Sequence, residues 1–364
     1  MGSASTDIAM MAEAIREARR GLFSTTPNPR VGCILAHGND IIARGFHHRA
    51  GEAHAEVNAL TQAGSAARGA TAYVSLEPCA HTGRTGPCAE ALIAAEVARV
   101  VVAVIDPNPA VSGKGIAALE RAGIRVDSGV LEAEATALNP GYMRRMGGGL
   151  PWVTLKIAMS LDGRTAMASG ESQWITGAAA RRDVQRLRAR SCAVITGIGT
   201  VLADDPSLTV RDVEIAGESP RQPLRVVLDS QLRMSSAARM LGLPGKTLVA
   251  HCRGDDETTA LDAAELISFG SAGHPDLTRL LRYLGERGCN EVMVEAGPTL
   301  AGAFMEAGLI DELVLYVAPT LLGSDARPML ALPLTTLSEQ KRLRVLEQVR
   351  LGEDVRITAR LLTR

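Results

Sequence analysis

Apolar side chains in the first 130 residues recur in turn at helical and at strand-like spacing. Ile8, Met11, Ile15, Ala18 and Leu22 predict an amphipathic helix over 7–22. The later elements are expected as strands over 30–36 and 40–45 joined by a turn at 37–39, a helix from 54 to about 67, strands over 70–76, 99–104 and 124–126, and a helix after Lys114. Such alternation predicts an α/β domain with helices around a mainly parallel sheet.

The second half of the chain repeats this alternation with longer apolar runs. A strand is expected from Pro151 to Met159, and buried strands over 193–196, 224–228, 247–250 and 291–295. Helices are expected over 178–190, 275–287 and 299–307, and closing strands over 311–317, 343–349 and 354–362. Gly147-Gly148-Gly149 predicts a flexible junction. We therefore expect two domains, 1–146 and 147–364.

Composition and charge narrow the class of partner. The 364 residues are 46% hydrophobic and carry a net charge of −1, which suits two buried cores. Residues 1–146 hold 14 basic and 14 acidic side chains and four aromatic ones. A nucleic-acid-binding face would need excess positive charge and stacking rings, so small-molecule substrates are favoured and no nucleic acid is expected.

Cysteine spacing and hydropathy indicate the compartment. The six cysteines do not form a spaced disulfide pattern, and no apolar run is long enough to span a bilayer or to serve as a signal segment. We expect a cytoplasmic protein without a membrane partner.

His54-Ala55-Glu56, followed by Pro78-Cys79 and Cys88, is the most informative motif of the chain. One imidazole and two thiolates can hold zinc tetrahedrally and leave a fourth position for water. The glutamate two residues after the histidine can then move protons while that water attacks an amidine-like carbon. This order of residues is typical of zinc-dependent nucleobase deaminases.

A closed structural zinc site is the alternative interpretation, with His81 or another cysteine as the fourth ligand. Closed sites usually present cysteines in close pairs, whereas eight residues separate Cys79 from Cys88. A closed site would also have no use for Glu56. Both observations favour an open, catalytic site.

Two glycine-containing turns in the second half could bind phosphate. Residues 196–200 (Thr-Gly-Ile-Gly-Thr) follow a predicted strand, and residues 295–302 join a strand to a helix that Pro298 can begin. A glycine after a strand is more often only a turn or packing residue. Spacing alone therefore predicts no more than a nucleotide or phosphate site.

The motifs together resemble the bifunctional riboflavin-biosynthesis deaminase/reductase family. Residues 45–57 and 76–88 are similar to its deaminase half; residues 155–163, 172–176, 201–206 and 294–300 are similar to its reductase half, in the family's order. The resemblance implies a cytidine-deaminase-like three-layer domain followed by a dihydrofolate-reductase-like domain. It implies hydrolytic removal of the 2-amino group of 2,5-diamino-6-(5-phosphoribosylamino)pyrimidin-4-one, then reduction of the ribosyl group to ribityl with NADPH.

The expected deaminase residues form three groups. His54, Cys79 and Cys88 are the expected zinc ligands, and zinc would lower the pKa of bound water toward ~7. Glu56 would carry the water's proton to the ring nitrogen and help ammonia to leave. The resemblance adds Asn28, His47, His81 and Arg84 as substrate contacts. Asn28 between two prolines could equally be a turn residue.

The expected reductase residues come from the resemblance. The cofactor contacts are Ala158, Trp174, Thr200, Asp204, Ser230 and the turn Gly297, Pro298, Thr299, Leu300, Ala301, Gly302 and Ala303. The substrate contacts are Ser172, Arg188, Leu208, Arg211 and Glu295, with Lys156 and Asp204 as candidates for charge stabilisation or proton supply. Trp174 could instead fill a core, and Arg188 could lie on a solvated helix face.

Three rival functions stay open at this point. One is a monofunctional nucleoside or tRNA deaminase with an unrelated appendage, and another is a non-enzymatic zinc module. The third is an active deaminase with a silent reductase. The family resemblance also implies a homo-oligomer.

Overall fold

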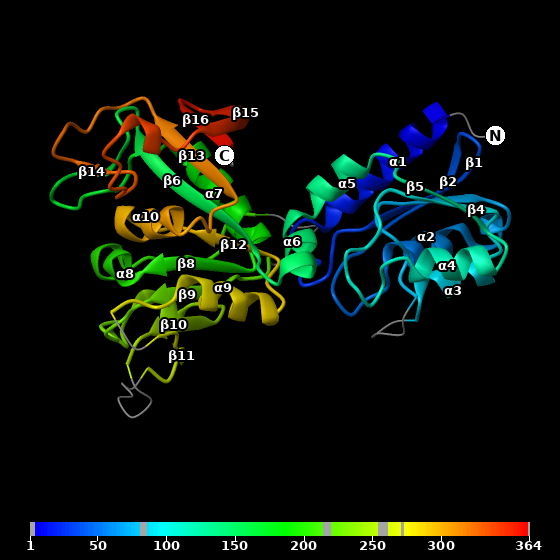
Figure 1. The fold of residues 1–364 in the computed structure, drawn as a ribbon, viewed down its shortest axis with the longest axis horizontal. Coiled ribbons are helices and arrows are strands. Elements are labelled where there is room, and N and C mark those ends of the chain that lie inside the picture. The colour runs from blue at the N-terminus through cyan, green and yellow to red at the C-terminus, as the bar shows by residue number, and fades with distance from the viewer. Residues whose placement is uncertain (1–3, 81–85, 214–219, 254–260, 271–272, 363–364) are drawn as a thin grey trace. The chain divides into compact units, whose positions relative to one another are not determined.

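The chain folds into two compact units, residues 1–149 and 150–364. The computed structural model describes residues 4–80, 86–213, 220–253, 261–270 and 273–362. The two units are described separately below, and Figure 1 labels their elements.

A five-stranded sheet in the order β2-β1-β3-β4-β5 forms the centre of the N-terminal unit. β1 (Gly32–His37) and β2 (Asp40–Phe46) form the predicted hairpin, and Gly38 in its turn has φ +59°, a conformation that favours glycine. β3 (Thr71–Val74), β4 (Arg99–Val102) and β5 (Arg125–Ser128) are mutually parallel. β1 is antiparallel to both neighbours, so the sheet is mixed, with two parallel and two antiparallel pairings, where the sequence predicted a mainly parallel one.

Helices cover both faces of this sheet, so the unit has three layers (Figure 1). Met11 and Ile15 of α1 (Ala4–Ala18) pack with Ile34, Tyr73 and residues of α5 (Glu132–Leu138) and α6 (Pro140–Gly148) on one face. The other face buries Cys33 and Val74 beneath α2 (Ala55–Ala63), α3 (Cys88–Ala94) and α4 (Lys114–Arg121). Alternate residues of each strand thus point into opposite cores.

The glycines at the end of this unit form part of a helix. Gly147 and Gly148 lie in the last turn of α6, and Gly149 ends that helix with φ +76°. Glycine in the left-handed conformation is a common helix terminator. The predicted flexible junction is therefore replaced by a helix end.

The C-terminal unit contains a nine-stranded sheet in the order β11-β10-β9-β8-β12-β6-β13-β16-β15. The strands are β6 (Trp152–Ser160), β8 (Ala193–Gly197), β9 (Leu224–Leu228), β10 (Thr247–His251), β11 (Glu265–Ser268), β12 (Glu291–Val294), β13 (Glu312–Ala318), β15 (Leu343–Leu351) and β16 (Asp354–Leu361). In this spatial order, the seven strands from β11 to β13 are mutually parallel. β16 is antiparallel to β13, and β15 is antiparallel to β16. β7 (Arg164–Ala166) and β14 (Arg327–Pro328) pair with each other in a separate two-stranded sheet.

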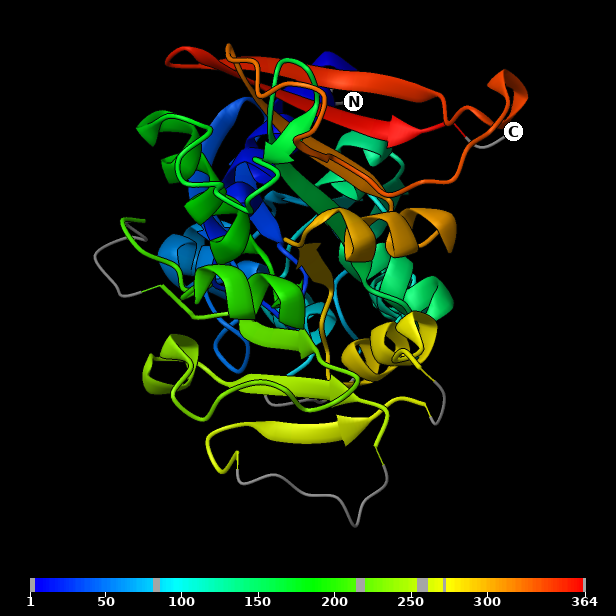
Figure 2. The same ribbon diagram turned by 90° about the vertical axis from the view of Figure 1, so that its left-hand side faces the viewer.

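Helices pack on both faces of the larger sheet (Figure 2). α9 (Leu277–Glu286) and α10 (Pro298–Glu306) bury Leu281 and Phe304 in the main core. α7 (Ala178–Arg190) and α8 (Ile198–Asp204), drawn in green, contribute to the clusters on the opposite face. The carboxyl ends of β6, β8, β9 and β12, which are neighbouring parallel strands, meet at one edge of the sheet.

Candidate functional site

The expected zinc ligand His54 lies at the start of α2, and a close contact between α2 and β2 fixes its position. His54 is the N-cap residue of α2. A Cβ atom on Gly45 would lie 2.2 Å from the carbonyl oxygen of Ala55, so only glycine lets α2 approach β2 this closely. The sequence motif that includes Gly45 therefore also positions the histidine.

The three expected metal ligands come together from separate elements. Cys79 follows β3 and Cys88 begins α3. His54 Nδ1 lies 3.1 Å from Cys88 Sγ and 3.6 Å from Cys79 Sγ, and all three ligand atoms lie within 4.8 Å of one another. Ligand atoms of a tetrahedral zinc site with bonds of about 2.0–2.3 Å are separated by roughly 3.3–3.8 Å. Both the donor types and their spacing fit zinc.

The two sulfurs differ in how readily they carry negative charge. A hydrogen bond between the thiols lowers the pKa of Cys79 and raises that of Cys88. The backbone N–H of Cys88 also donates to Cys79 Sγ over 3.4 Å. Cys79 is thus the sulfur that most readily carries negative charge, and thiolate is the form that binds zinc.

Glu56 lies in the first turn of α2 and is only 3% exposed. Burial raises the pKa of Glu56 to about 7, against the opposing effects of backbone hydrogen bonding and His54. Within the described residues, the metal-binding cluster contains only His54, Cys79 and Cys88. His81, the fourth ligand that the closed alternative would use, lies outside the described residues.

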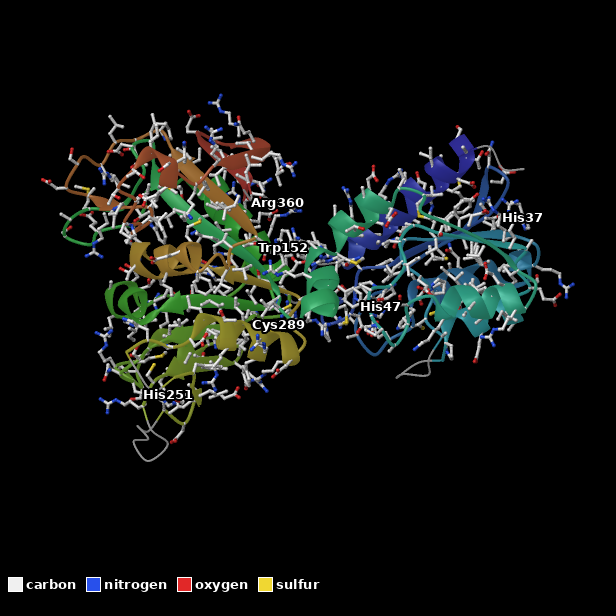
Figure 3. All side chains as sticks on the ribbon, viewed as in Figure 1. His37, His47, Trp152, His251, Cys289 and Arg360 are labelled. Atoms are coloured by element: carbon white, nitrogen blue, oxygen red, sulfur yellow. The ribbon has the colours of Figure 1, made fainter. Side chains whose placement is uncertain are left out.

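Asn28 and His47 lie together in the N-terminal unit. Asn28 Nδ2 is 3.0 Å from His47 Nε2, and His47 Nδ1 is 3.1 Å from the carbonyl oxygen of Ala53 (Figure 3 labels His47). The rings of His47 and His54 meet edge to face with centroids 5.1 Å apart. These contacts place Asn28 near the metal ligands. The remaining expected substrate residues, His81 and Arg84, lie outside the described residues.

In the C-terminal unit, Glu295 forms a largely buried cluster with Lys156 and Arg188, two other residues of the expected reductase site. Its Oε1 accepts from Lys156 Nζ at 3.1 Å and from Arg188 at 2.8 Å, and its Oε2 accepts from Arg188 Nε at 3.0 Å. Burial alone would raise the pKa of Glu295, but the charges of Arg188 and Lys156 hold it well below its ordinary value. Arg188 is 9% exposed, so the alternative of a solvated helix face is wrong.

Arg188 also connects this cluster to the segment that carries Leu208 and Arg211. It donates to the carbonyl oxygen of Thr209, and Gln185 of the same helix accepts from the backbone N–H of Arg211. The bonds described here occupy three of the five N–H groups of Arg188. Two of its N–H groups have no partner among the described residues, which is compatible with the expected substrate contact.

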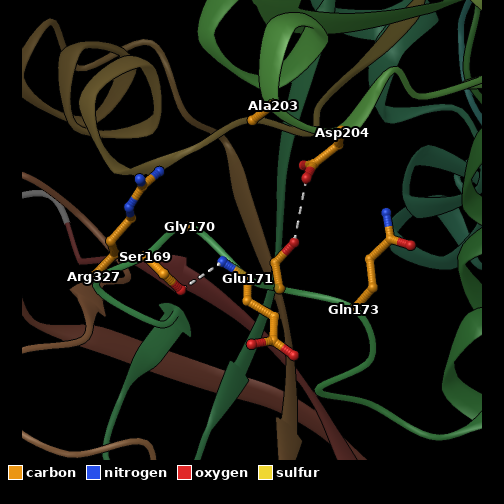
Figure 4. A pocket seen from close by; sticks show the side chains of 8 residues that line it. Ser169, Gly170, Glu171, Gln173, Ala203, Asp204 and Arg327 are labelled. Carbon is orange, nitrogen blue, oxygen red and sulfur yellow. Dashed lines mark hydrogen bonds between the residues drawn. The ribbon is translucent and has the colours of Figure 1, made fainter.

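A cavity of about 450 Å³ adjoins α8 (Figure 4). Ser172 Oγ lies 3.5 Å from Asp204 Oδ1 in its wall, which joins one expected substrate residue to one expected cofactor residue. The wall also contains Glu171, Gln173 and Arg327, which the sequence interpretation did not select. Their position after β7 and in β14 depends on a strand pair that the sequence pattern did not predict.

The two predicted phosphate turns are neighbours. A Cβ atom on Gly197 would lie 3.5 Å from Leu300, so the turn before α8 contacts the start of α10. Thr200 lies in α8, Ser230 follows β9, and Ala158 lies in β6. Thr299 is exposed, whereas Ala301 and Gly302 are buried inside the unit. Trp174 is 69% exposed and carries the Arg181 guanidinium 4.7 Å above its ring, so the core-filling alternative is wrong.

Comparison with known families covers both units. The cytidine and deoxycytidylate deaminase zinc-binding region matches residues 4–104, and the RibD C-terminal domain matches residues 151–357. The riboflavin biosynthesis protein RibD of Escherichia coli (strain K12) is 51% identical over 354 residues, 95% of this chain and 96% of that protein. The chain belongs to the RibD family.

Solved structures agree with this assignment to RibD. A structure of Acinetobacter baumannii RibD has 47% identity and a TM-score of 0.93, covering 99% of this chain and 100% of that one. The Thermotoga maritima diaminohydroxyphosphoribosylaminopyrimidine deaminase/5-amino-6-(5-phosphoribosylamino)uracil reductase has 30% identity and a TM-score of 0.87, with 99% of both chains covered. The predicted deaminase-like and reductase folds are confirmed.

As a RibD protein, the chain is a bifunctional enzyme of riboflavin biosynthesis, with a zinc-dependent deaminase and an NADPH-dependent reductase. An unrelated appendage and a non-enzymatic zinc module are both excluded, because each half matches its own enzyme domain. Among the described residues, no helix has the length and apolarity that crossing a bilayer requires.

Sequence reasoning missed one buried carboxylate close to the zinc ligands of this RibD chain. Glu77 is 4% exposed and precedes Pro78-Cys79, yet its partners are backbone N–H groups 29 to 39 residues later. Its place directly before the Pro-Cys dipeptide was the one signal available.

Proposed function

We propose that residues 1–146 remove the 2-amino group of 2,5-diamino-6-(5-phosphoribosylamino)pyrimidin-4-one by hydrolysis. The observation that supports this is the cluster of His54, Cys79 and Cys88, with buried Glu56 beside it. Zinc held by these three side chains supplies the Lewis acidity that makes water reactive at neutral pH. Three protein ligands also leave room for the reacting atoms.

In this proposal Glu56 moves the protons of the hydrolysis. Its carboxylate takes a proton from water as the oxygen bonds to C2, and delivers it to the adjacent ring nitrogen. Glu56 then carries the remaining proton of the new C2 hydroxyl to the amino group, so that the C2–O bond becomes a carbonyl, the C2–N bond breaks and ammonia leaves. Burial in the first turn of α2 holds the carboxylate in place and limits exchange with bulk solvent.

The residues proposed to bind the substrate in the deaminase unit are Asn28, His47, His81 and Arg84. Asn28 supplies an amide near the metal ligands, and its hydrogen bond to His47 fixes the direction of that amide. The roles of His81 and Arg84 rest on the family resemblance alone.

We propose that residues 147–364 reduce the ribosyl group of the deaminated product to ribityl; the compact unit itself begins three residues later, at Leu150. NADPH supplies the hydride. The residues proposed to hold it are Ala158, Trp174, Thr200, Asp204, Ser230 and the turn Gly297, Pro298, Thr299, Leu300, Ala301, Gly302 and Ala303. Because Ala301 and Gly302 are buried, their contribution is to shape the start of α10.

The substrate residues proposed for the reductase are Ser172, Arg188, Leu208, Arg211 and Glu295. Arg188 and Arg211 offer planar paired donors that suit a phosphate. Lys156 and Asp204 are proposed to stabilise charge or supply a proton at the reacting carbon. The ion pair with Glu295 fixes Lys156 Nζ, and Asp204 faces the cavity beside Ser172. Alignment of cofactor and sugar carbon is the main requirement for hydride transfer.

A coupled assay tests both halves of the proposal. The purified protein is mixed with the diamino substrate and NADPH, and ammonia release and NADPH oxidation are followed separately. Both signals are expected, with oxidation following ammonia release. Ammonia without NADPH oxidation would mean that the reductase is silent, and neither signal with zinc-loaded protein would reject the proposal.

We further propose a homo-oligomer in the cytoplasm that acts on phosphoribosyl-pyrimidines. None of the six cysteines, all of which belong to the described residues, forms a disulfide, which suits a reducing compartment. Light scattering of the purified protein would test the oligomer, and a monomer at micromolar concentration would contradict it.

A further inference from the structure

Glu77 is a buried carboxylate whose two oxygens bind a distant segment of the backbone. Oε2 accepts from the N–H groups of Asp106 (3.2 Å) and Gly113 (3.0 Å). Oε1 accepts from Gly115 (3.0 Å) and Ile116 (3.3 Å). Four N–H donors can stabilise a buried negative charge, and two of them belong to the first turn of α4.

The same contacts fix the backbone that leads to Cys79. β3 ends at Val74, so Cys79 itself lies outside regular secondary structure. The backbone N–H of Glu77 donates to Val104, and the Cys79 carbonyl accepts from Ala89. Gly115 of α4 also lies against this segment, because a Cβ atom on Gly115 would lie 1.9 Å from the Pro78 carbonyl oxygen. The start of α4 thus packs directly on the dipeptide that carries the ligand.

From this arrangement we propose that Glu77 is a positioning residue of the zinc site. It ties the Pro78-Cys79 backbone to residues 106–116, so that Cys79 Sγ is presented to His54 and Cys88 before metal binds. The inference rests on the proposed zinc ligands. Glu77 need not touch zinc or substrate: it acts only through the position of Cys79.

Loss of this support should weaken metal binding more than it alters the fold. Glu77→Gln keeps the shape of the side chain but replaces one acceptor oxygen by an NH₂ group that faces N–H donors. Changes in the groups that support metal ligands typically weaken metal affinity about 10- to 100-fold. We expect a loss in that range. Glu77→Asp keeps the charge but is one methylene shorter, so it should show a smaller loss.

The experiment uses the full-length protein and the variants E77Q, E77D and C79S. E90Q is the matched control, because Glu90 is an exposed glutamate in the first turn of α3. Zinc affinity is measured by competition with a chromophoric chelator, and the visible spectrum of the Co²⁺-substituted protein reports the ligand geometry. Thermal unfolding reports on the folding of the N-terminal unit, and NADPH-dependent reduction of deaminated substrate reports on the C-terminal unit.

We expect E77Q to bind zinc about 10- to 100-fold more weakly than the wild type and to have altered Co²⁺ bands. The zinc affinity and spectrum of E90Q should equal those of the wild type, and the reductase activity of both variants should be unchanged. Wild-type affinity and spectrum in E77Q, even with a lower Tm, would overturn the proposal and leave Glu77 as a loop support only. If E77Q does not fold, wild-type zinc binding by E77D would overturn it. Undiminished zinc binding by C79S would instead contradict the proposed ligand set.

Discussion

Asn28 and His47 are joined by a hydrogen bond of 3.0 Å whose direction the structure determines. His47 Nδ1 lies 3.1 Å from the Ala53 carbonyl oxygen, which can only accept, so Nδ1 carries the ring proton. In the neutral ring, Nε2 must then accept from Asn28 Nδ2. The Asn28 Oδ1 atom is therefore directed away from His47, as the proposed role of Asn28 as a substrate contact requires.

Asn28→Asp should impair deamination, because the carboxylate cannot donate to His47 Nε2 and adds a charge near the metal ligands. Loss of a hydrogen bond to a partly buried group costs about 1–3 kcal/mol, which corresponds to roughly a 5- to 150-fold fall in kcat/KM. Ammonia release measures this effect. Asn39→Asp in the exposed β1–β2 turn serves as the control, and equal kcat/KM in both variants would contradict the role of Asn28.

Glu56→Gln should retain zinc and lose most deamination, because the amide has nearly the same shape but cannot carry a proton. General acid–base catalysis contributes about 10²- to 10⁴-fold, so a fall of this size in kcat is expected. NADPH oxidation with pre-deaminated substrate should persist. Metal analysis and both activities are measured beside Glu52→Gln, an exposed control. An equal loss of both activities would argue against two independent sites.

The sequence predicted elements best where the apolar pattern was continuous. The helix 178–190 has the predicted limits, and the β1–β2 hairpin follows from two apolar runs around Gly38. α8 was missed because the Thr-Gly-Ile-Gly-Thr segment was interpreted as a turn, and α6 because its last turn contains Gly147 and Gly148. Glycine is unfavourable within helices, and Gly147, Gly148 and Gly199 are exposed. The buried side chains of these helices are Tyr142 of α6 and Ile198 and Val201 of α8.

The candidate sites were predicted unevenly for a physical reason. The zinc site could be proposed from the sequence, because the residue types and order of His54, Glu56, Cys79 and Cys88 indicate their chemistry. Glu77 and Arg327 depend on contacts with segments far along the chain. Glu77 binds backbone N–H groups, which every residue except proline carries. No pattern of side chains could therefore reveal its partners.

Acid stability of the N-terminal unit should depend on Asp7. Asp7 is 8% exposed and accepts two hydrogen bonds from Arg99, at 2.8 and 2.9 Å, and these lower its pKa. Because the folded pKa lies below the unfolded one, the stabilisation is complete above about pH 4 and is lost as the pH falls through the folded value. Hydrogen bonds to charged groups contribute about 1.5–3 kcal/mol.

Asp7→Asn should therefore lower the unfolding free energy by about that amount at pH 7, with a smaller difference below pH ~3. Calorimetry records the unfolding of both units. Tryptophan fluorescence identifies the transition of the C-terminal unit, because both tryptophans, Trp152 and Trp174, belong to it. The remaining transition is that of the N-terminal unit. Asp40→Asn, at an exposed position that begins β2, is the control. A difference between wild type and Asp7→Asn that is constant from pH 7 to pH 3 would contradict the assigned pKa shift.

Glu295→Gln should damage the reductase alone. Lys156 and Arg188 would lose the carboxylate that neutralises them, and both side chains are largely buried. Removing one partner of a buried ion pair costs about 3–5 kcal/mol, so the fluorescence transition of Trp152 and Trp174 should shift to lower temperature. Reduction of deaminated substrate should fall because Lys156 Nζ and the Arg188 guanidinium are no longer held, whereas ammonia release should stay at the wild-type rate. Glu286→Gln, at the exposed end of α9, is the matched control. Wild-type reduction by Glu295→Gln would show that this cluster neither binds substrate nor positions Lys156.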